Sequence, residues 1–574
     1  MGFFDFDNML SHSLQRLNPS ESFLKFFIVL NLFLVAFSAN ATDYYVSNNG
    51  NDSNSGTSPD QAWKTLDKVN SFTPSPGDKI LFKCEDEWVG TIKINASGRL
   101  GSNIVYGAYG TGAKPKIYGS ELVTGTWSVY SGNIYSIPFS GTVNQVFEDG
   151  VRLTSARYPN SGYADITTFH SKSSVTARSL PNIDHTNSIA YIRTGRWSLE
   201  AETVSRTGNS NTRLYLSAST HYTMKAGDGL LLTNNLEYID KAGEWYHDGS
   251  TLYVWTSYGT RPSNNNVRAS TIDNVIDISS QSYVTLTDLD IQQANSHGVY
   301  VSNSDYITMD KLTVTNNELI GIEIANTGSS YCTIKECHIN GAYAFGIRTR
   351  GNNHLIQDNT IENIGLFSDI GLGGINSDMD GQMGVGMYIT NGSGGNSIIK
   401  YNTVKNVGYN GIWYYDNPNT LIEYNYLNNC CLTIDDGGGI YAYGNKFNAA
   451  EDSDGSIIRY NIIDGVLGTR AGSSGTRLQG NGIYTDEKIA NTDVYDNVIA
   501  NVGEGGIKQH DNTNVTARNN ILFNCGMGLD PLNNSRGNHM KSNIVLNTAD
   551  VEPREVGKQG YLGLVNSAQD AATA

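Results

Sequence analysis

A short Gly-apolar motif recurs along the second half of the chain and limits the folds open to it. It reads "GVYVSN" at 298, "GIEIAN" at 321, "GIRTRG" at 346, "GMYITN" at 386, "GIWYYD" at 411, "GIYAYG" at 439, "GIYTDE" at 482 and "GIKQHD" at 506. After each Gly, the first and third residues are mostly apolar or small, and the second and fourth are large or polar. This period of two is typical of a strand with one buried face.

A second motif, in which Asn follows a short apolar segment, comes after these strands. Two sets of asparagines take equivalent places in successive repeats: Asn359, Asn402, Asn425, Asn461, Asn497, Asn520 and Asn543, and, four residues on, Asn363, Asn406, Asn429, Asn501, Asn524 and Asn547. Most repeats are about 22 to 28 residues long and lack a helical period, which predicts a solenoid of short parallel strands. Stacked asparagine amides would satisfy the bent backbone between rungs.

The segments at 439 and 482 are 43 residues apart, almost twice the usual repeat. We expect residues 446–480, which are rich in Gly, Ser and Asp, to form a loop inserted into one coil. The two segments would then lie on adjacent rungs, about 4.8 Å apart.

These repeats resemble the right-handed parallel β-helix of the pectin-lyase-like superfamily over residues 270–550, and "YYVSNNGNDSNSG" and "GDKILFKCEDEWVG" resemble the entry to such a helix. Two further segments, "FEDGVRLTSARYPN" and "AGEWYHDGSTLYVW", are similar to segments of β-helix glycoside hydrolases of the β-xylosidase and α-fucosidase type. The resemblance implies an all-β fold, a right-handed parallel β-helix with an inserted β-sandwich-like N-terminal region.

The chain divides into five segments on these patterns. We expect a signal peptide over 1–41, an N-terminal cap and the first coils over 42–120, an inserted β-rich domain over 121–270, and the parallel β-helix with its active face over 271–550. The C-terminal tail over 551–574 ends abruptly, and we expect it to be truncated. Residues 26–37 are a 12-residue apolar run that follows Lys25 and precedes a small-x-small site at Ala39 and Ala41. This run is short for a membrane span and predicts a secreted, extracellular or periplasmic protein with no membrane insertion after signal cleavage.

Composition restricts the partners. The net charge is −17, which argues against nucleic acid and anionic membranes as partners. The six cysteines include no CxxC pair and no Cys/His cluster with zinc spacing, so we expect them to be reduced and buried. We expect a monomer that needs no cofactor. The acidic turns "NSDMDG" at 376–381 and "EDSDGS" at 451–456 are weak candidates for calcium binding and do not fit EF-hand spacing.

Equivalent positions stack in a β-helix, so the outward residues can be read as columns. The second residue after each Gly gives Tyr300, Glu323, Arg348, Tyr388, Trp413, Tyr441, Tyr484 and Lys508, and the positions that follow add Arg350, Tyr415, Asp416, Tyr443, Asp486, Glu487 and His510. Aromatic rings match the apolar faces of sugars. We therefore predict a carbohydrate-binding surface made by Trp413, Tyr415, Tyr441, Tyr443, Tyr484, Lys508 and Arg348. The alternative is a tyrosine ladder that only stabilises the sheet.

Acidic residues on the same face indicate chemistry. Glycoside hydrolysis needs one protonated and one ionised carboxyl group. Asp486 is the first candidate, beside His510, and its partner is Asp436, Glu487 or Asp416. The alternative for Asp486 is a surface carboxylate paired with Lys508.

The leading interpretation is a secreted polysaccharide-degrading glycoside hydrolase whose partner is a polysaccharide or oligosaccharide. The first alternative is a polysaccharide lyase or C5-epimerase that acts on an acidic polysaccharide through Arg348, Arg350, Lys508 and His510. The second is a carbohydrate-binding β-helix surface protein that is not an enzyme, although its outward columns would then be expected to repeat evenly.

Overall fold

The structure is a computed structural model, and it describes residues 41–208, 211–366, 384–390, 394–444, 455–532, 535–546 and 564–565. The expected signal peptide, apart from Ala41, and the turn at 376–381 lie outside these residues, as do most of the turn at 451–456, Asn547 and most of the C-terminal tail. Among the described residues, none forms a helix that is long and apolar enough to cross a membrane.

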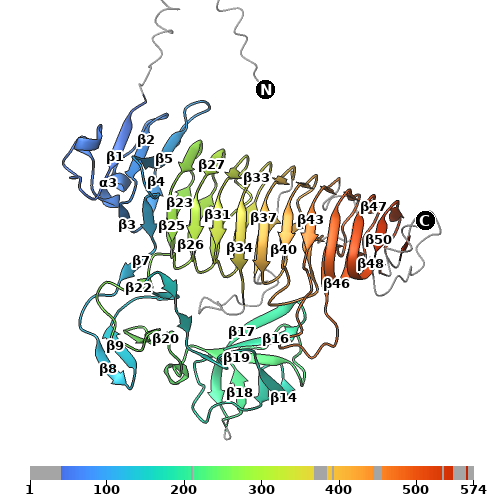
Figure 1. Cartoon of the computed structure of the whole chain (residues 1–574). Coiled ribbons are helices and arrows are strands. Elements are labelled where there is room, and N and C mark those ends of the chain that lie inside the picture. Colours follow the sequence, from blue (N-terminus) through green and yellow to red (C-terminus); the bar gives the residue numbers. More distant parts are fainter. Residues whose placement is uncertain are drawn as a thin grey trace, which may run out of the picture. The chain divides into compact units, whose positions relative to one another are not determined.

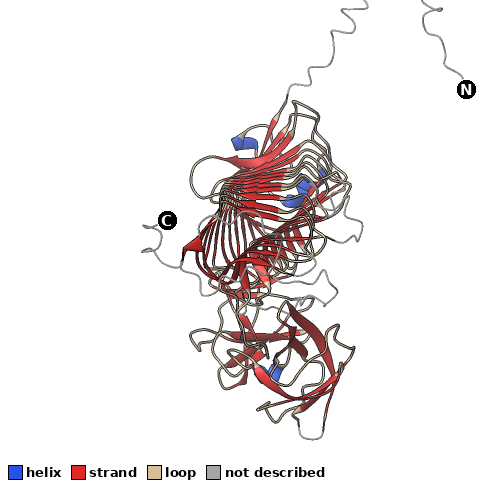
Figure 2. Cartoon of the chain, turned by 90° about the vertical axis from the view of Figure 1, so that its right-hand side faces the viewer, coloured by secondary structure: helices blue, strands red, loops and turns tan. Residues whose placement is uncertain are grey.

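Three rows of parallel strands form a β-helix (Figures 1 and 2). The first row is β1 (Asp43–Val46), β2 (Lys79–Lys83), β5 (Ile104–Tyr109), β24 (Val284–Thr287), β27 (Ile307–Asp310), β30 (Thr333–Lys335), β33 (Leu355–Gln357), β36 (Ile398–Lys400), β39 (Leu421–Glu423), β42 (Ile457–Arg459), β45 (Asp493–Tyr495), β47 (Thr516–Arg518) and β49 (His539–Lys541).

The second row carries the Gly-apolar motif, and we call its outer side the front face. It is β4 (Ile92–Ile94), β23 (Asn274–Ser279), β26 (His297–Ser302), β29 (Ile320–Ile324), β32 (Phe345–Arg350), β35 (Val385–Thr390), β38 (Ile412–Tyr415), β41 (Gly437–Tyr443), β44 (Gly480–Thr485), β46 (Val498–Gln509) and β48 (Ile521–Pro531).

The third row is β3 (Glu87–Val89), β6 (Lys116–Tyr118), β25 (Asp290–Gln292), β28 (Thr313–Thr315), β31 (His338–Asn340), β34 (Thr360–Ile364), β37 (Thr403–Val407), β40 (Tyr426–Asn428) and β43 (Ile462–Asp464), which continues into β46, β48, β50 (Ile544–Leu546) and β51 (Leu564–Val565). The short helix α3 (Leu66–Ser71) precedes β2, and Thr65 caps it by accepting a hydrogen bond from the Lys68 backbone N–H.

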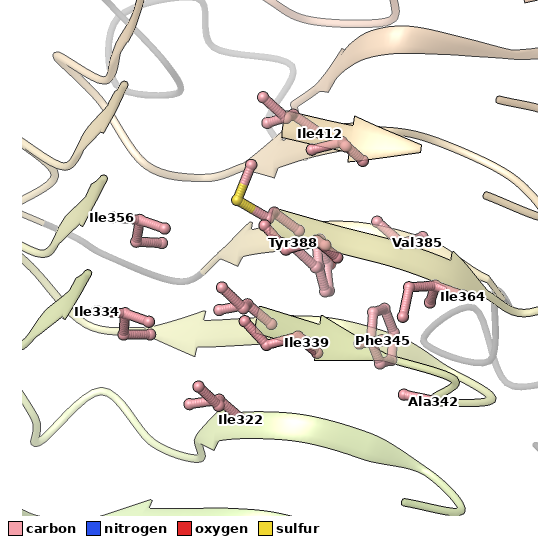
Figure 3. Close-up of a cluster of buried hydrophobic side chains, with 14 of the residues drawn as sticks. Ile322, Ile334, Ile339, Ala342, Phe345, Ile356, Ile364, Val385, Tyr388 and Ile412 are labelled. Atoms are coloured by element: carbon pink, nitrogen blue, oxygen red, sulfur yellow. The ribbon is translucent and has the colours of Figure 1, made fainter. Parts of the chain in front are cut away.

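Isoleucines from the three rows fill the interior of the coils. On the front row, the register pairs Ile412, Ile440, Ile483 and Ile507 in one column, and all four side chains are fully buried. Figure 3 shows Ile322 from the front row, Ile334 and Ile356 from the first row and Ile339 from the third gathered in one cluster. The column that the period of two predicted is confirmed, because each alternate side chain must enter the same apolar interior.

The first asparagine set forms one continuous buried ladder, as predicted. Asn461 shows the pattern. Its backbone N–H and Nδ2 both donate to Asn497 Oδ1 at 3.0 Å, and its own Oδ1 accepts hydrogen bonds from the backbone N–H and Nδ2 of Asn425. The chain of bonds runs through Asn359, Asn402, Asn425, Asn461, Asn497, Asn520 and Asn543. The ladder satisfies the backbone N–H groups at the turn between the first and third rows.

The second asparagine set lies at the next turn and is more exposed. Asn363, Asn406, Asn429, Asn501 and Asn524 all have positive φ angles, which Asn tolerates better than most residues. Asn406, Asn429 and Asn524 each donate to the preceding asparagine of the set. Asn501 donates instead to Asp464, because the equivalent position of that coil is Gly465, which has no side chain.

The prediction that residues 446–480 form one loop is wrong in part. Residues 457–459 and 462–464 are β42 and β43, regular strands that pair with β39 and β40 below them. The segments at 439 and 482 do lie on adjacent rungs, because β41 pairs directly with β44. The extra length lies on either side of β42 and β43, over 445–454, outside the described residues, and in the connection 465–479.

The inserted region contributes three further sheets. Two of them are a four-stranded sheet of β11 (Val151–Arg152), β10 (Val146–Glu148), β22 (Val267–Ser270) and β7 (Ser120–Leu122), and a five-stranded sheet of β12 (Thr154–Ser155), β20 (Glu244–His247), β21 (Thr251–Trp255), β9 (Ile134–Pro138) and β8 (Ser128–Ser131). A short 3₁₀ turn, Leu236–Tyr238, precedes β20.

The third inserted sheet closes on itself. β13 (Arg157–Tyr158), β14 (Ala164–Ser171), β15 (Ser174–Ala177), β18 (Arg213–Leu216), β17 (Ser198–Thr207), β16 (Ile189–Gly195) and β19 (Gly229–Thr233) are joined by antiparallel pairs, and β16 pairs back onto β19. We call this element the inserted barrel. Its own apolar core includes Ile166, Val204, Leu214 and Leu232.

All six cysteines are free in the structure. Five are buried, as expected, and Cys84 is partly exposed. Burial raises the pKa of Cys332, Cys337, Cys430 and Cys525 to about 12, so these thiols stay protonated and act as small apolar side chains.

Candidate active site

The outward column on the front face has the predicted membership. The register pairs Tyr300, Glu323, Arg348, Tyr388, Trp413, Tyr441, Tyr484 and Lys508 in this order. The period of two therefore assigned the front face correctly along eight rungs.

The prediction of an open aromatic surface is wrong for the central part of this column. Trp413, Tyr441 and Tyr484 are only 5%, 7% and 4% exposed. Their rings contact one another, with centroids 5.6 Å apart between Trp413 and Tyr441 and 5.2 Å between Tyr441 and Tyr484. Leu199 and Leu231 of the inserted barrel belong to the same apolar cluster. These three rings therefore form a buried ladder instead of a flat surface open to a polysaccharide.

Asp486 directly follows β44, and its side chain is 13% exposed. Its Oδ2 accepts a hydrogen bond from Tyr441 Oη at 2.7 Å, and its Oδ1 lies 2.7 Å from His510 Nδ1. The hydrogen bond to Asp486 raises the pKa of His510. Burial, followed by the Asp486 charge, raises the pKa of Tyr441 well above its usual value, so that Tyr441 remains a donor.

Asp436 precedes β41 and has a positive φ of 64°. A Cβ atom on the next residue, Gly437, would lie 2.4 Å from Asn410 Oδ1, so the close approach of the backbone there requires glycine. The Asp436 side chain is 22% exposed. Burial raises the pKa of Asp436, Lys508 opposes this effect, and the charges of Asp486 and Glu504 add to it.

Glu504 is a site residue that the sequence analysis missed. Lys508 Nζ lies 2.8 Å from Glu504 Oε2 and 3.5 Å from Asp436 Oδ1, and Gln479 Nε2 donates to Glu504 Oε1 at 3.1 Å. The signal was present in the sequence: "DGGGI" and "EGGI" each place an acid before glycines and an isoleucine of the same buried column. The two acids therefore enter the site from the same end of their strands.

The sequence predicted Lys508 as an outward substrate contact, but its side chain is only 5% exposed. Its Nζ lies 4.6 Å from the centre of the Tyr484 ring as well as beside the two carboxylates. Burial lowers the pKa of Lys508, but Asp436 and Glu504 outweigh this effect and raise it. Lys508 is therefore a permanently charged bridge between Asp436 and Glu504.

Arg193 of the inserted barrel holds the residue next to Asp436. Its guanidinium is fully buried, and Nη2 lies 3.2 Å from Asp435 Oδ1. The same group donates to the carbonyl oxygens of Thr433, Thr469 and Ala471. The Asp435 backbone N–H also donates to the Arg196 carbonyl at 3.0 Å. The turn that carries Asp436 is thus fixed from the barrel side.

Three other predicted residues lie apart from the pair formed by Asp436 and Asp486. Arg348 donates to Glu323 Oε2 at 2.7 Å and lies five rungs from Lys508, so the structure does not bring it to the site. Asp416 ends the strand two rungs from Asp486. Glu487, the nearest of the three, directly follows Asp486 and is partly exposed.

Tyr415 and Tyr443 keep the exposure that the sequence predicted. They lie on consecutive rungs, each two residues after a member of the buried ladder on the same strand. Both are partly exposed, and their rings stack with centroids 5.9 Å apart. Across the described ranges, no group of three or more His, Cys, Asp or Glu side chains is arranged to hold a metal ion.

The two central carboxyl groups have different environments. Burial and the charges of Asp486 and Glu504 raise the pKa of Asp436, which favours its protonated form, whereas the Asp486 carboxylate accepts a hydrogen bond from Tyr441 and lies 2.7 Å from His510 Nδ1. A carboxyl group with a raised pKa beside a second carboxylate is a recurrent arrangement for acid and base chemistry.

Comparison with known proteins supports the fold. The family model described as a right handed beta helix region matches residues 274–454. No curated protein matches the sequence. Similar solved structures include a glycoside hydrolase, which is 13% identical with a TM-score of 0.56 over 87% of this chain and 97% of the other, and XylC in complex with xylose, which is 13% identical with a TM-score of 0.57 over 91% and 86%. The chain therefore folds as a right-handed parallel β-helix.

Proposed function

We propose that this protein is an exported glycoside hydrolase in which Asp436 acts as the general acid and Asp486 as the carboxylate that attacks the sugar or activates water. The observation that carries this proposal is the contrast between the two carboxyl groups. Burial raises the pKa of Asp436, so it can hold a proton for the glycosidic oxygen. Asp486, whose two oxygens contact Tyr441 and His510, would stabilise the positive charge that develops on the sugar.

Lys508 and Glu504 support the acid without touching the scissile bond in this scheme. The Lys508 charge offsets the repulsion that Asp486 and Glu504 impose on Asp436. The acid therefore retains the ability to ionise after it gives up its proton, which each catalytic cycle requires.

The lyase alternative needs a basic residue that can lose its proton. Lys508 is a poor choice, because its two carboxylate neighbours raise its pKa. Arg348 is paired with Glu323 at a distance of five rungs, so the cations that would bind and deprotonate a uronate are divided. The geometry thus favours hydrolysis over elimination.

Xylose-containing oligosaccharides are the first substrates to test, since a protein of similar fold was determined with xylose. The purified enzyme is incubated with xylo-oligosaccharides and, separately, with polygalacturonate. New reducing ends and the ultraviolet absorbance of unsaturated sugars are measured in parallel. Hydrolysis gives reducing ends alone, whereas absorbance that rises with them would overturn the proposal in favour of elimination.

The roles are tested with isosteric amides. Asp436→Asn and Asp486→Asn should each lower kcat by about 10²–10⁴-fold and leave the melting temperature nearly unchanged. Asp416→Asn, an acidic residue on the same face two rungs away, is the matched control and should retain activity. Full activity in either central variant would show that another group performs the chemistry.

A further inference from the structure

Two half-exposed groups of aromatic side chains, one on each part of the chain, border the acidic site. Tyr415 and Tyr443 end the strands of the β-helix beside Asp486. On the inserted barrel, Trp197 lies in the turn before β17, and the Tyr222 ring contacts it with centroids 5.4 Å apart at 90°. Trp197, Tyr415 and Tyr443 pack against the same apolar cluster.

The two groups lie where the barrel contacts the β-helix, because the carbonyl of Arg196, the residue before Trp197, accepts a hydrogen bond from the Asp435 backbone N–H at 3.0 Å. Burial and the charges of Glu487 and Asp486 raise the pKa of Tyr443, and Tyr222 adds to this effect. The Arg193 contacts and a hydrogen bond from the Gly229 backbone N–H to the Gly472 carbonyl, 2.8 Å long, hold the barrel beside the front face. Figure 1 shows β16, β17 and β19 below the coils that carry β37, β40 and β43.

A buried carboxylate fixes the loop that carries Tyr222. Glu200 is fully buried, and its carboxylate accepts hydrogen bonds from the backbone N–H groups of His221 and Tyr222 and from the Thr194 hydroxyl. A buried carboxylate is costly unless its lone pairs are satisfied. These hydrogen bonds satisfy the Glu200 carboxylate and fix the backbone of the loop at His221 and Tyr222.

We propose that Trp197 and Tyr222 of the inserted barrel, together with Tyr443, form a binding subsite for a sugar ring next to the one that is cleaved. This inference rests on the proposed function, because Asp486 and His510 define where cleavage occurs. Partly exposed rings offer apolar faces to sugar C–H groups, and the tyrosine hydroxyls and the exposed His221 imidazole can bond to sugar hydroxyl groups. Unlike the buried ladder, these rings are reachable by a ligand.

The test measures binding in the Asp486→Asn background, in which the proposed function predicts no consumption of substrate. Calorimetric titrations use hexasaccharides of xylan, cellulose, arabinan and galacturonan, and the tightest ligand is then compared with its disaccharide. Tyr222→Ala should weaken the hexasaccharide about tenfold or more, as aromatic stacking on flat ligands predicts. Tyr222→Phe keeps the ring and should retain most of the affinity.

Tyr130→Ala is the matched control, since Tyr130 is an exposed tyrosine on β8 that contacts Tyr253 and not the front face. Equal affinity in Tyr222→Ala and its parent, or an equal loss in the Tyr130 control, would overturn the subsite. The proposed function is tested separately by the hydrolytic activity of the Asp486→Asn variant, and activity that persists in this variant would contradict it. The Tyr222 titrations measure binding alone and do not depend on which residue performs the chemistry.

Discussion

At the residue scale, the chemistry of the site depends on Lys508, one buried cation shared by two carboxylates. It lies within 3.5 Å of Asp436 and 2.8 Å of Glu504. A cation next to a buried acid lowers its pKa, and here that effect opposes burial and two like charges. The balance sets the pH range in which Asp436 holds a proton.

Lys508→Met should therefore move the alkaline limb of the kcat–pH profile to higher pH. Removing the cation removes the effect that lowers the pKa of Asp436, so the acid stays protonated at higher pH. The profile is measured on a neutral oligosaccharide. Lys508→Arg keeps the charge and should leave the limb in place, and a limb that moves to lower pH in Lys508→Met would contradict the assignment of Asp436 as the acid.

At the element scale, two sets of contacts hold parts of the chain together. The buried asparagine ladder joins neighbouring coils, and the Arg193 contacts join the barrel to the turn before β41. Asn461→Ala removes an amide with partners on both neighbouring rungs and leaves buried backbone groups unpaired. It should lower the free energy of unfolding by about 1–3 kcal/mol, measured by denaturant titration. Asn406→Gly, in the more exposed set, keeps the positive φ and should cost markedly less.

Arg193→Met should destabilise the protein by about 3–5 kcal/mol, because it leaves the Asp435 carboxylate buried without its cation. It should also lower kcat more than it raises KM, since the turn bearing Asp436 loses its support from the barrel. Arg206→Met, on the exposed side of the barrel, is the control. A loss of stability with unchanged kcat would mean that Arg193 is a purely structural residue.

At the scale of the whole molecule, the negative net charge is expected to repel negatively charged ligands. The net charge is −17. Around the site, six acids outnumber four bases: the acids are Asp435, Asp436, Asp486, Glu487, Glu504 and Asp530, and the bases are Arg193, Arg196, Lys508 and His510. A field of one sign repels ligands of the same sign at low salt. The site is therefore better suited to neutral sugars than to uronates.

The kcat/KM for a neutral oligosaccharide should be nearly independent of ionic strength. Any residual activity on an oligogalacturonate should rise severalfold when salt is raised, because screening weakens the repulsion. Stopped assays at low and high sodium chloride with both substrates make the comparison. Faster turnover of the uronate at low salt would indicate attraction, and hence a different electrostatic role for Lys508.

Periodicity alone was enough to determine the solenoid, its isoleucine column, its asparagine ladder and the order of the outward column. Each coil meets only its neighbours, so a local pattern repeated along the chain specifies the stacking without any distant information. The same reasoning placed Asp486 and His510 side by side, as the structure has them, and left Asp436, Glu487 and Asp416 as three possible partners of Asp486. Glu504 could have been found too, from the acid that precedes the Gly-Gly-Ile segment of its rung.

Only the tertiary structure decided which outward residues are exposed and how they are paired. The inserted barrel comes from residues about 200 positions before the site, and no repeat links Arg193 to Asp435 or Leu199 to the aromatic column. In the folded chain, Trp413, Tyr441 and Tyr484 form a buried ladder instead of the expected open surface, and the barrel places Trp197 next to the turn that carries Asp435. A sequence pattern specifies the direction in which a side chain leaves its strand, whereas burial depends on what another part of the chain places above it.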